Sequence, residues 1–126
     1  MKNRNLTLLT DLYQLTMMNG YYLKGRHEQV AIFDLFFRQN KLITYSLAAG
    51  LEQVVDYLQN LNFGEKEIEY LRSLNLFDEG FLKYLSSLKF TGDVYAVPEG
   101  TVVFPGEPIF TIRAPIIQAQ LVETAI

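Results

Sequence analysis

The sequence predicts an α+β fold in which helices pack on a small β-sandwich or hammerhead of short strands. Two observations support this prediction. Up to Lys89, apolar residues mostly recur every three or four positions, which is the spacing of an amphipathic helix. After Lys89, short alternating runs are separated by turns that contain proline and glycine. With 126 residues, of which 49% are hydrophobic and 20% charged, the chain can form one globular domain with its own core.

The first predicted helix begins after Asp11, a good N-cap that is followed three residues later by Gln14, as in a capping box. Apolar residues lie on two sides of this helix, and such a helix is either deeply buried or held between two partners. One side carries Leu12, Leu15 and Tyr22, and the other carries Tyr13, Met17 and Tyr21. Tyr13 therefore has two interpretations: its ring fills the core, or it presents a flat face to a flat ligand.

A strand is predicted next, over 30–38, because alternate residues form an apolar face. Asp34 and Arg38 lie on its other face, about 13 Å apart at roughly 3.3 Å per residue. We therefore expect each of them to have its own partner. Arg38, at the end of the strand, either belongs to a half-solvated face or reaches an anionic group, to which arginine can donate bidentate hydrogen bonds.

The remaining elements are three amphipathic helices and then three strands. The charged residues of the helices form solvated faces, which indicates a structural role. After a connecting stretch at 39–46, the helices cover 47–61, a segment opening at Glu65 and a segment capped by Asp78. The strands cover 93–97, 101–104 and 109–113, with turns at 98–100 and 105–108. Carrier domains that hold biotin or lipoate share such a hammerhead, but no lysine follows Lys89 to carry the cofactor.

Composition argues against several classes of function. A net charge of −3 with scattered lysine and arginine residues argues against a nucleic-acid surface. Without cysteine, the chain can form neither disulfides nor a thiolate metal site, which fits a cytoplasmic protein. No apolar run approaches the ~18 residues of a membrane span. The single histidine, His27, has no second ligand type near it in the sequence, so no metal site is predicted.

The last residues predict an amphipathic helix that has neither a cap nor a glycine stop. We therefore expect the chain to be a fragment of a longer protein. In this interpretation, residues 1–115 form an N-terminal α+β domain, and residues 116–126 form the first part of a helix that leads into a further domain.

Five short motifs follow one another along the chain: Thr10-Asp11-Leu12-Tyr13-Gln14 with Met17 and Gly20-Tyr21, Phe33-Asp34-Leu35-Phe36-Phe37-Arg38, Ala49-Gly50-Leu51, Pro98-Glu99-Gly100-Thr101 with Phe104-Pro105-Gly106-Glu107-Pro108, and Gln120-Leu121-Val122-Glu123-Thr124. From Leu9 to Ile126 the chain thereby resembles the nicotinate phosphoribosyltransferases, a family of type II phosphoribosyltransferases in which these motifs occur in the same order. Each motif is weak alone, but five in register make the resemblance specific. One departure lies at 39–45, where the family often has a loop with proline or glycine.

The resemblance implies the N-terminal domain of an enzyme whose α/β barrel is absent from these 126 residues. The family joins nicotinate to 5-phosphoribosyl-1-pyrophosphate in NAD salvage, giving nicotinate mononucleotide and pyrophosphate, with ATP as cosubstrate and Mg²⁺ as the ion. Tyr13 matches a tyrosine that stacks on the pyridine ring across the interface of a homodimer with shared active sites. Asp11 would support Tyr13, and Arg38 is a candidate for a phosphate contact. The phosphorylated histidine of the ATP reaction belongs to the barrel, so no catalytic residue is expected here.

Two alternatives to this assignment stay open. Relatives that use nicotinamide or quinolinate share the same domain plan, and the residues that separate these substrates lie mostly beyond Ile126. In a different class, the chain by itself is a non-catalytic module for packing or dimerisation.

Overall fold

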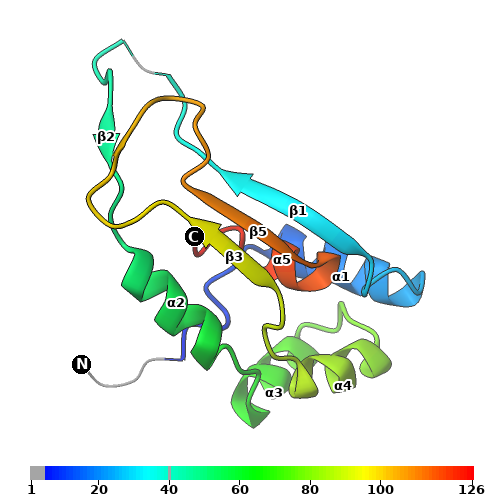
Figure 1. The fold of residues 1–126 in the computed structure, drawn as a ribbon. Coiled ribbons are helices and arrows are strands. Elements are labelled where there is room, and N and C mark those ends of the chain that lie inside the picture. Colours follow the sequence, from blue (N-terminus) through cyan, green and yellow to red (C-terminus); the bar gives the residue numbers. More distant parts are fainter. Residues whose placement is uncertain (1–4, 40) are drawn as a thin grey trace.

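The computed structural model describes residues 5–39 and 41–126, and Figure 1 shows how their helices and strands are arranged. In chain order the elements are α1 (Leu12–Leu23), β1 (Val30–Leu35), β2 (Ser46–Leu47), α2 (Leu51–Asn60), α3 (Glu65–Ser73), α4 (Glu79–Ser87), β3 (Asp93–Ala96), β4 (Val102–Val103), β5 (Phe110–Pro115) and α5 (Ile116–Val122). This combination of helices with small separate sheets confirms the predicted α+β class.

The larger sheet has three antiparallel strands in the order β1-β5-β3. Phe33, Ile112 and Val94 lie opposite one another on its inner face, which packs on the hydrophobic core. The outer face is open, and Ile32 on it is 63% exposed. Helix α5 lies against β1 and β5, and α1 packs on α5, so both helices cover the inner side of the sheet (Figure 1).

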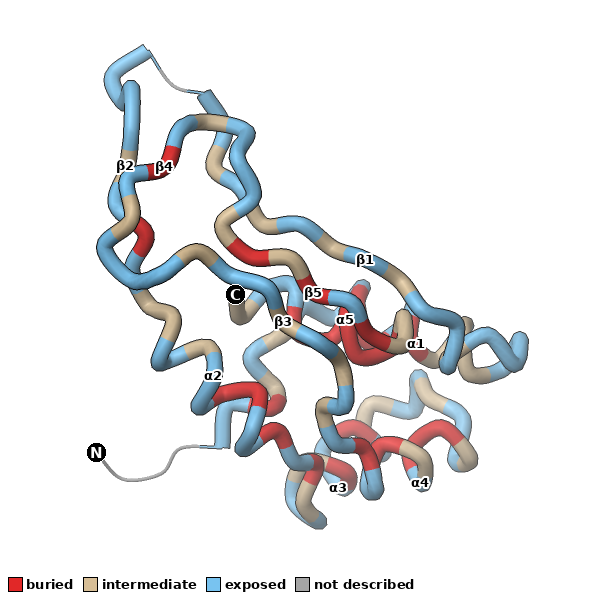
Figure 2. The backbone as a smooth tube through the Cα atoms, in the orientation of Figure 1, coloured by how far each residue is buried: buried red, intermediate tan, exposed pale blue. Residues whose placement is uncertain are grey.

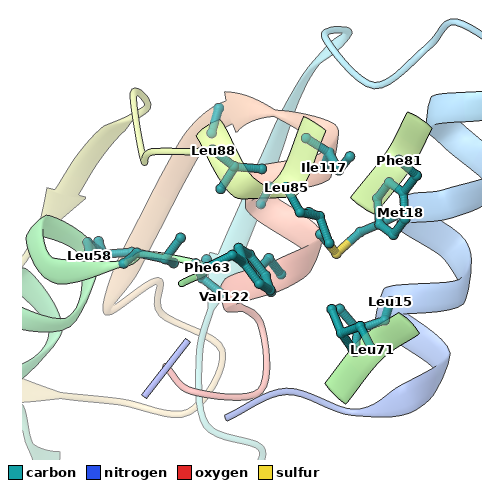
Figure 3. Packing of buried hydrophobic residues seen from close by; sticks show 14 of the residues in the cluster. Leu15, Met18, Leu58, Phe63, Leu71, Phe81, Leu85, Leu88, Ile117 and Val122 are labelled. Carbon is teal, nitrogen blue, oxygen red and sulfur yellow. The ribbon is translucent and has the colours of Figure 1, made fainter. Parts of the chain in front are cut away.

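The core lies where the helices meet this inner face, and the buried stretches in Figure 2 gather on α1, α3, α4, β5 and α5. Met18 of α1 is fully buried and lies beside Phe81 and Leu85 of α4 (Figure 3). The amphipathic helix predicted to open at Glu65 is confirmed as α3, and its Ile68 and Leu71 are buried. Large apolar side chains from helices far apart in sequence thus form one core, which is the main source of folding free energy.

The smaller sheet pairs β2 with β4 at one end of the molecule, away from the core (Figure 1, Figure 2). Beside it, the turn around Glu99 contacts the start of α2. Both carboxylate oxygens of Glu99 accept hydrogen bonds from the backbone N–H of Gly50, and one also accepts from Leu51 at 3.0 Å. Gly50 has a φ of 104°, a conformation that would strain a residue with a side chain.

Several predicted elements are longer than the strands and helices in the structure. The strand predicted over 30–38 pairs only as far as Leu35. The strand predicted over 101–104 shortens to β4 and pairs with β2, so the predicted sandwich or hammerhead is two separate sheets. The helix predicted over 47–61 begins at Leu51, because Leu47 belongs to β2. The predicted final helix starts at Ile116 and its regular part ends at Val122.

None of the helices in the described ranges has both the length and the hydrophobicity needed to cross a bilayer.

Candidate functional site: the junction of α1 and α5

The N-terminal end of α1 lies against the C-terminal end of α5, and polar side chains from both ends form one hydrogen-bonded network. The capping box predicted for α1 is present. Gln14 Oε1 accepts a hydrogen bond from the Asp11 backbone N–H at 2.9 Å. The Asp11 carboxylate accepts one from the Thr124 hydroxyl at 3.0 Å. The cap of α1 is therefore tied directly to the residues that follow α5.

Gln14 is the buried centre of this network. Its side chain has no exposed surface, although it lies in the first turn of α1. Its Oε1 accepts from the Thr10 hydroxyl and from Asp11 N–H, and it shares the single proton of the Thr124 hydroxyl with the Asp11 carboxylate. Its Nε2 donates to Glu123 at 3.0 Å. A buried amide costs folding free energy unless its polar atoms are paired, and here they are.

Glu123 accepts hydrogen bonds from three side chains. Gln120 Nε2 donates at 2.7 Å and Gln14 Nε2 at 3.0 Å, both to Oε2. The Tyr13 hydroxyl donates to Oε1 at 3.3 Å. The carboxylate thus holds α1 to α5 and fixes the end of the Tyr13 side chain in space. No ion pair in the described residues includes Glu123 or Asp11, so neither carboxylate is neutralised by a cation there.

Tyr13 is half exposed, at 50%, so its ring does not fill the core. That the ring presents a face to a flat ligand stays a prediction. Met17, one helical turn further on, is also exposed, at 41%. Desolvation of the phenol, with the negative charges of Glu123 and Asp11 and the hydrogen bond to Glu123, raises the pKa of Tyr13 above its usual value. The side chain is therefore a neutral phenol at physiological pH.

The prediction for the other apolar side of α1, which carries Leu12, Leu15 and Tyr22, is only partly correct. Leu15 is buried as expected, but Leu12 is 52% exposed. Tyr22 packs as a core-edge residue, with its ring centroid 6.0 Å from that of Phe81. The single buried face of α1 consists of Gln14, Leu15 and Met18, so the polar Gln14 takes a place that the apolar pattern does not indicate.

Arg38 does not join this network. It follows β1 in the exposed stretch after Leu35, and in the described part of the chain its guanidinium has no carboxylate partner. It lines a shallow hollow of about 290 Å³ with Phe36, Pro105 and Gly106. Asp34, by contrast, accepts a hydrogen bond from the Thr111 hydroxyl across the β1–β5 ladder. The structure therefore brings Asp11 and Tyr13 together and leaves Arg38 apart.

His27 belongs to an aromatic cluster. Its ring centroid lies 5.1 Å from that of Tyr22 and 5.0 Å from that of Tyr84, whose hydroxyl donates to Glu28. Burial and this contact with Glu28 raise the pKa of Tyr84. Across the described residues, no group of three or more His, Cys, Asp or Glu side chains is placed to hold a metal ion.

A larger open hollow of about 640 Å³ lies between α3 and α4, where Arg72 and Glu79 form a bidentate ion pair. It contains none of the residues predicted for the site. Its walls are two adjacent amphipathic helices, so its shape follows from their packing.

Sequence reasoning missed the α5 side of the site. Gln120, Glu123 and Thr124 lie within a motif that carries the family resemblance, but nothing local to that motif indicates what they contact. Glu123 and Thr124 contact residues at the start of α1 that are more than 100 residues away in sequence, and Gln120 contacts Glu123. Their place in this motif is the signal that could have identified them. What they contact depends on the packing of α1 on α5.

Comparison with known proteins agrees with the resemblance. A family model described as the nicotinate phosphoribosyltransferase N-terminal domain matches residues 8–126. The chain belongs to this family.

Curated nicotinate phosphoribosyltransferases match nearly the whole chain. One from Mycobacterium tuberculosis is 49% identical over 120 residues, covering 93% of this chain and 25% of the relative. One from Bacillus subtilis is 44% identical over 126 residues, covering 99% of this chain and 26% of the relative. The chain therefore spans about a quarter of the length of these relatives.

Solved structures agree with the fold. The crystal structure of human nicotinic acid phosphoribosyltransferase matches with a TM-score of 0.83 at 37% identity, covering 92% of this chain and 24% of that one. A nicotinate-nucleotide pyrophosphorylase from Pyrococcus furiosus matches with a TM-score of 0.66, covering 99% of this chain and 25% of that one. At 19% identity this second match supports the fold alone.

Proposed function

We propose that this chain is the N-terminal domain of an enzyme that joins nicotinate to 5-phosphoribosyl-1-pyrophosphate. The products are nicotinate mononucleotide and pyrophosphate, and the reaction is coupled to ATP hydrolysis for NAD salvage. The observation that carries this proposal is the match of residues 8–126 to the family model. The names of the curated relatives support nicotinate as the substrate.

Within this reaction, Tyr13 stacks on the pyridine ring of the substrate. Its half-exposed ring and its fixed hydroxyl support this role, since a stacking side chain must be open on one face and held in place. Asp11 supports Tyr13 by holding the start of α1 and its contact with Thr124. Displacement at the ribose carbon needs positioning and charge stabilisation more than covalent chemistry, so a residue that orients the ring contributes directly.

Arg38 is a separate proposal, for a phosphate or pyrophosphate contact. Its exposed guanidinium has no carboxylate partner in the described ranges, which leaves it available for an anion. It is not part of the Tyr13 network, so it would contact a different portion of the bound substrates.

The full enzyme is proposed to act in the cytoplasm as a homodimer with active sites shared between subunits. ATP and Mg²⁺ belong to the rest of that enzyme. Mg²⁺ takes carboxylate and phosphate oxygens, and the described residues of this chain offer no suitable set of carboxylates. No step is therefore assigned to the metal or to ATP in this domain.

The proposal is tested with the complete enzyme that contains this domain. Purified protein is supplied with ATP, Mg²⁺ and 5-phosphoribosyl-1-pyrophosphate, and with nicotinate, nicotinamide or quinolinate in parallel. Formation of nicotinate mononucleotide from nicotinate, with a much lower kcat/KM for the other two rings, is the expected result. A higher kcat/KM for nicotinamide or quinolinate would contradict the proposed substrate.

A second candidate, a non-catalytic packing module, is favoured for the isolated chain by the exposed apolar side chains around β2 and β4. Leu47 is 59% exposed, Val102 48% and Phe104 52%. Residues 1–126 alone should therefore give no turnover of nicotinate. Measurable turnover by this chain would contradict the proposal that residues 1–126 are non-catalytic on their own.

A further inference from the structure

The geometry points to Glu123 as a positioning residue that acts through Tyr13. Its carboxylate fixes the phenol and maintains negative charge at the hydroxyl end of the ring. As a result, Tyr13 binds a positively charged pyridinium ring better than a neutral pyridine ring. This inference rests on the proposed function and assigns a role to a residue outside the predicted site.

The first support is the way the carboxylate is held. Glu123 stands at the C-cap of α5, and both of its oxygens are engaged by side chains of known position. Two of the donors, Gln14 and Gln120, are themselves buried. Moving Oε2 out of the junction would leave two buried amides unpaired, which costs free energy, so the carboxylate stays there with Oε1 at 3.3 Å from the Tyr13 hydroxyl.

The second support is the local charge. Asp11 and Glu123 are the carboxylates whose charges act on Tyr13, and within the described residues neither forms an ion pair with a cation. A hydroxyl that donates to a carboxylate has its charge polarised toward the ring, and the face of an aromatic ring already attracts cations. The surroundings of Tyr13 thus favour positive charge on whatever lies against its open face.

The third support is the chemistry of the reaction. The ring nitrogen of nicotinate uses its lone pair to form a bond to C1′ of the ribose, while the C1′–O bond to pyrophosphate breaks. Pyrophosphate leaves with that electron pair, and no proton is transferred. The ring nitrogen, now with four bonds, carries a positive charge. An interaction that strengthens as this charge develops lowers the barrier, whereas one that is equal before and after affects only binding.

A purely structural role for Glu123 makes a different prediction. If Glu123 only held α1 to α5 through Gln14, its loss would weaken the binding of both rings equally. The ratio of the dissociation constants of nicotinate and nicotinate mononucleotide separates the two roles. The ligands share the ring carboxylate and differ in ring charge and in the ribose 5-phosphate, and the ribose 5-phosphate is the same in every variant compared.

The experiment uses the complete enzyme and measures both dissociation constants by calorimetry for the wild type, Glu123→Gln, Tyr13→Phe and the double variant. Glu123→Gln and Tyr13→Phe should each weaken the binding of nicotinate mononucleotide about three- to tenfold more than the binding of nicotinate. The double variant should lose no more than about twofold beyond Tyr13→Phe, because Glu123 acts through the hydroxyl. Both single variants should lower kcat more than they raise the KM for nicotinate.

Glu28→Gln is the matched control, because it neutralises a carboxylate that accepts from a different tyrosine, Tyr84, outside the α1–α5 junction. It should leave the ratio within about twofold of the wild type. An unchanged ratio in Glu123→Gln or Tyr13→Phe, in an enzyme that turns over nicotinate, would overturn the role of Glu123 alone. The same would follow if Glu123→Gln had its full effect in the Tyr13→Phe background.

Two further outcomes are decisive. If Glu123→Gln does not fold, Tyr13→Phe provides the test, because it removes only a half-exposed hydroxyl. Under this inference it must still shift the ratio of the two dissociation constants. If the wild-type enzyme has no activity with nicotinate, the proposed function fails, and the role of Glu123 fails with it.

Discussion

Tyr13 and Tyr57 are both tyrosines on helices, yet their surroundings give them opposite properties. Tyr13 is half exposed and its hydroxyl is paired with Glu123. Tyr57 is 9% exposed, and no described residue forms a hydrogen bond with its hydroxyl. The exposed ring of Tyr13 is therefore the candidate for ligand binding. The buried Tyr57 carries a hydroxyl that forms no hydrogen bond with the described residues, so it adds no hydrogen-bond free energy to folding.

Replacing Tyr13 by alanine should raise the KM for nicotinate in the complete enzyme at least about tenfold, because ring stacking contributes roughly 0.5–1.5 kcal/mol beyond the area lost. Steady-state kinetics with varied nicotinate measures this. Tyr70→Ala is a suitable control, since Tyr70 is a 56% exposed tyrosine on α3, away from the α1–α5 junction. An unchanged KM in Tyr13→Ala would remove Tyr13 from the site.

Replacing Tyr57 by phenylalanine should leave the free energy of unfolding unchanged or raise it by about 1 kcal/mol at pH 7, because the buried hydroxyl has no described partner. The pH dependence gives a second measurement. Burial raises the pKa of Tyr57 to about 12 from its usual 10.0, so the native state holds the proton more tightly than the unfolded state. The stability linked to this phenol is present below pH 10 and is lost as pH rises from 10 through 12.

Urea unfolding of wild type and Tyr57→Phe at pH 8 and at several values above pH 10 tests this difference. The wild type should lose stability faster than the variant across that window, by at most about 1.4 kcal/mol per pH unit. Parallel loss in both proteins would mean that the Tyr57 phenol does not contribute to the alkaline transition.

At the scale of single elements, the caps of two helices show what can be read from sequence. Asp11 and Asp78 were both predicted as N-caps, and both helices begin where predicted. A cap depends on residues within one turn, so the sequence contains the whole signal. The cap of α2 is different, because Gly50 and Leu51 donate to Glu99, nearly fifty residues later. No local pattern indicates that contact.

The Glu99 cap can be tested by stability. Glu99→Ala leaves the first N–H groups of α2 without their acceptor and should lower the free energy of unfolding by about 1–2 kcal/mol. Glu52→Ala, at an exposed acidic residue in the first turn of the same helix, should change it by less than about 0.5 kcal/mol. Chemical denaturation of both variants measures the contrast, and equal values would exclude a specific cap by Glu99.

Gly92 and Gly20 offer a matched pair for the packing of elements. A Cβ added at Gly92 would lie 2.5 Å from Ala114 Cβ and 2.8 Å from the Arg113 carbonyl oxygen, so β5 and the segment before β3 would have to move apart. Gly92→Ala should therefore cost about 1–3 kcal/mol of stability. Gly20→Ala, in α1 with open space around the added atom, should stabilise by roughly 0.5–1 kcal/mol. Thermal unfolding that ranked the two variants in the reverse order would contradict this packing.

At the scale of the whole molecule, the sequence predicts the helices better than the strand pairing. The apolar spacing of α3 and α4 is local and periodic, so both helices could be predicted, and Leu71, Phe81 and Leu85 on them are buried. The partner of β4 could not, because β2 is far away in sequence and only two residues long. Tyr13 and Asp11 were predicted for the site through their motif, whereas the contacts of Glu123 with Tyr13 and Gln14 depend on the packing of α1 on α5.

The direct junction of β5 and α5 has a consequence for insertions and deletions. Strand β5 ends at Pro115 and helix α5 begins at Ile116, with no loop between them. One residue added there would rotate every later position of the helix by about 100°. An added residue within β5 would exchange its two faces. Homologous chains should therefore keep a constant length from Phe110 to Glu123, whereas the exposed stretch at 41–45 can vary in length.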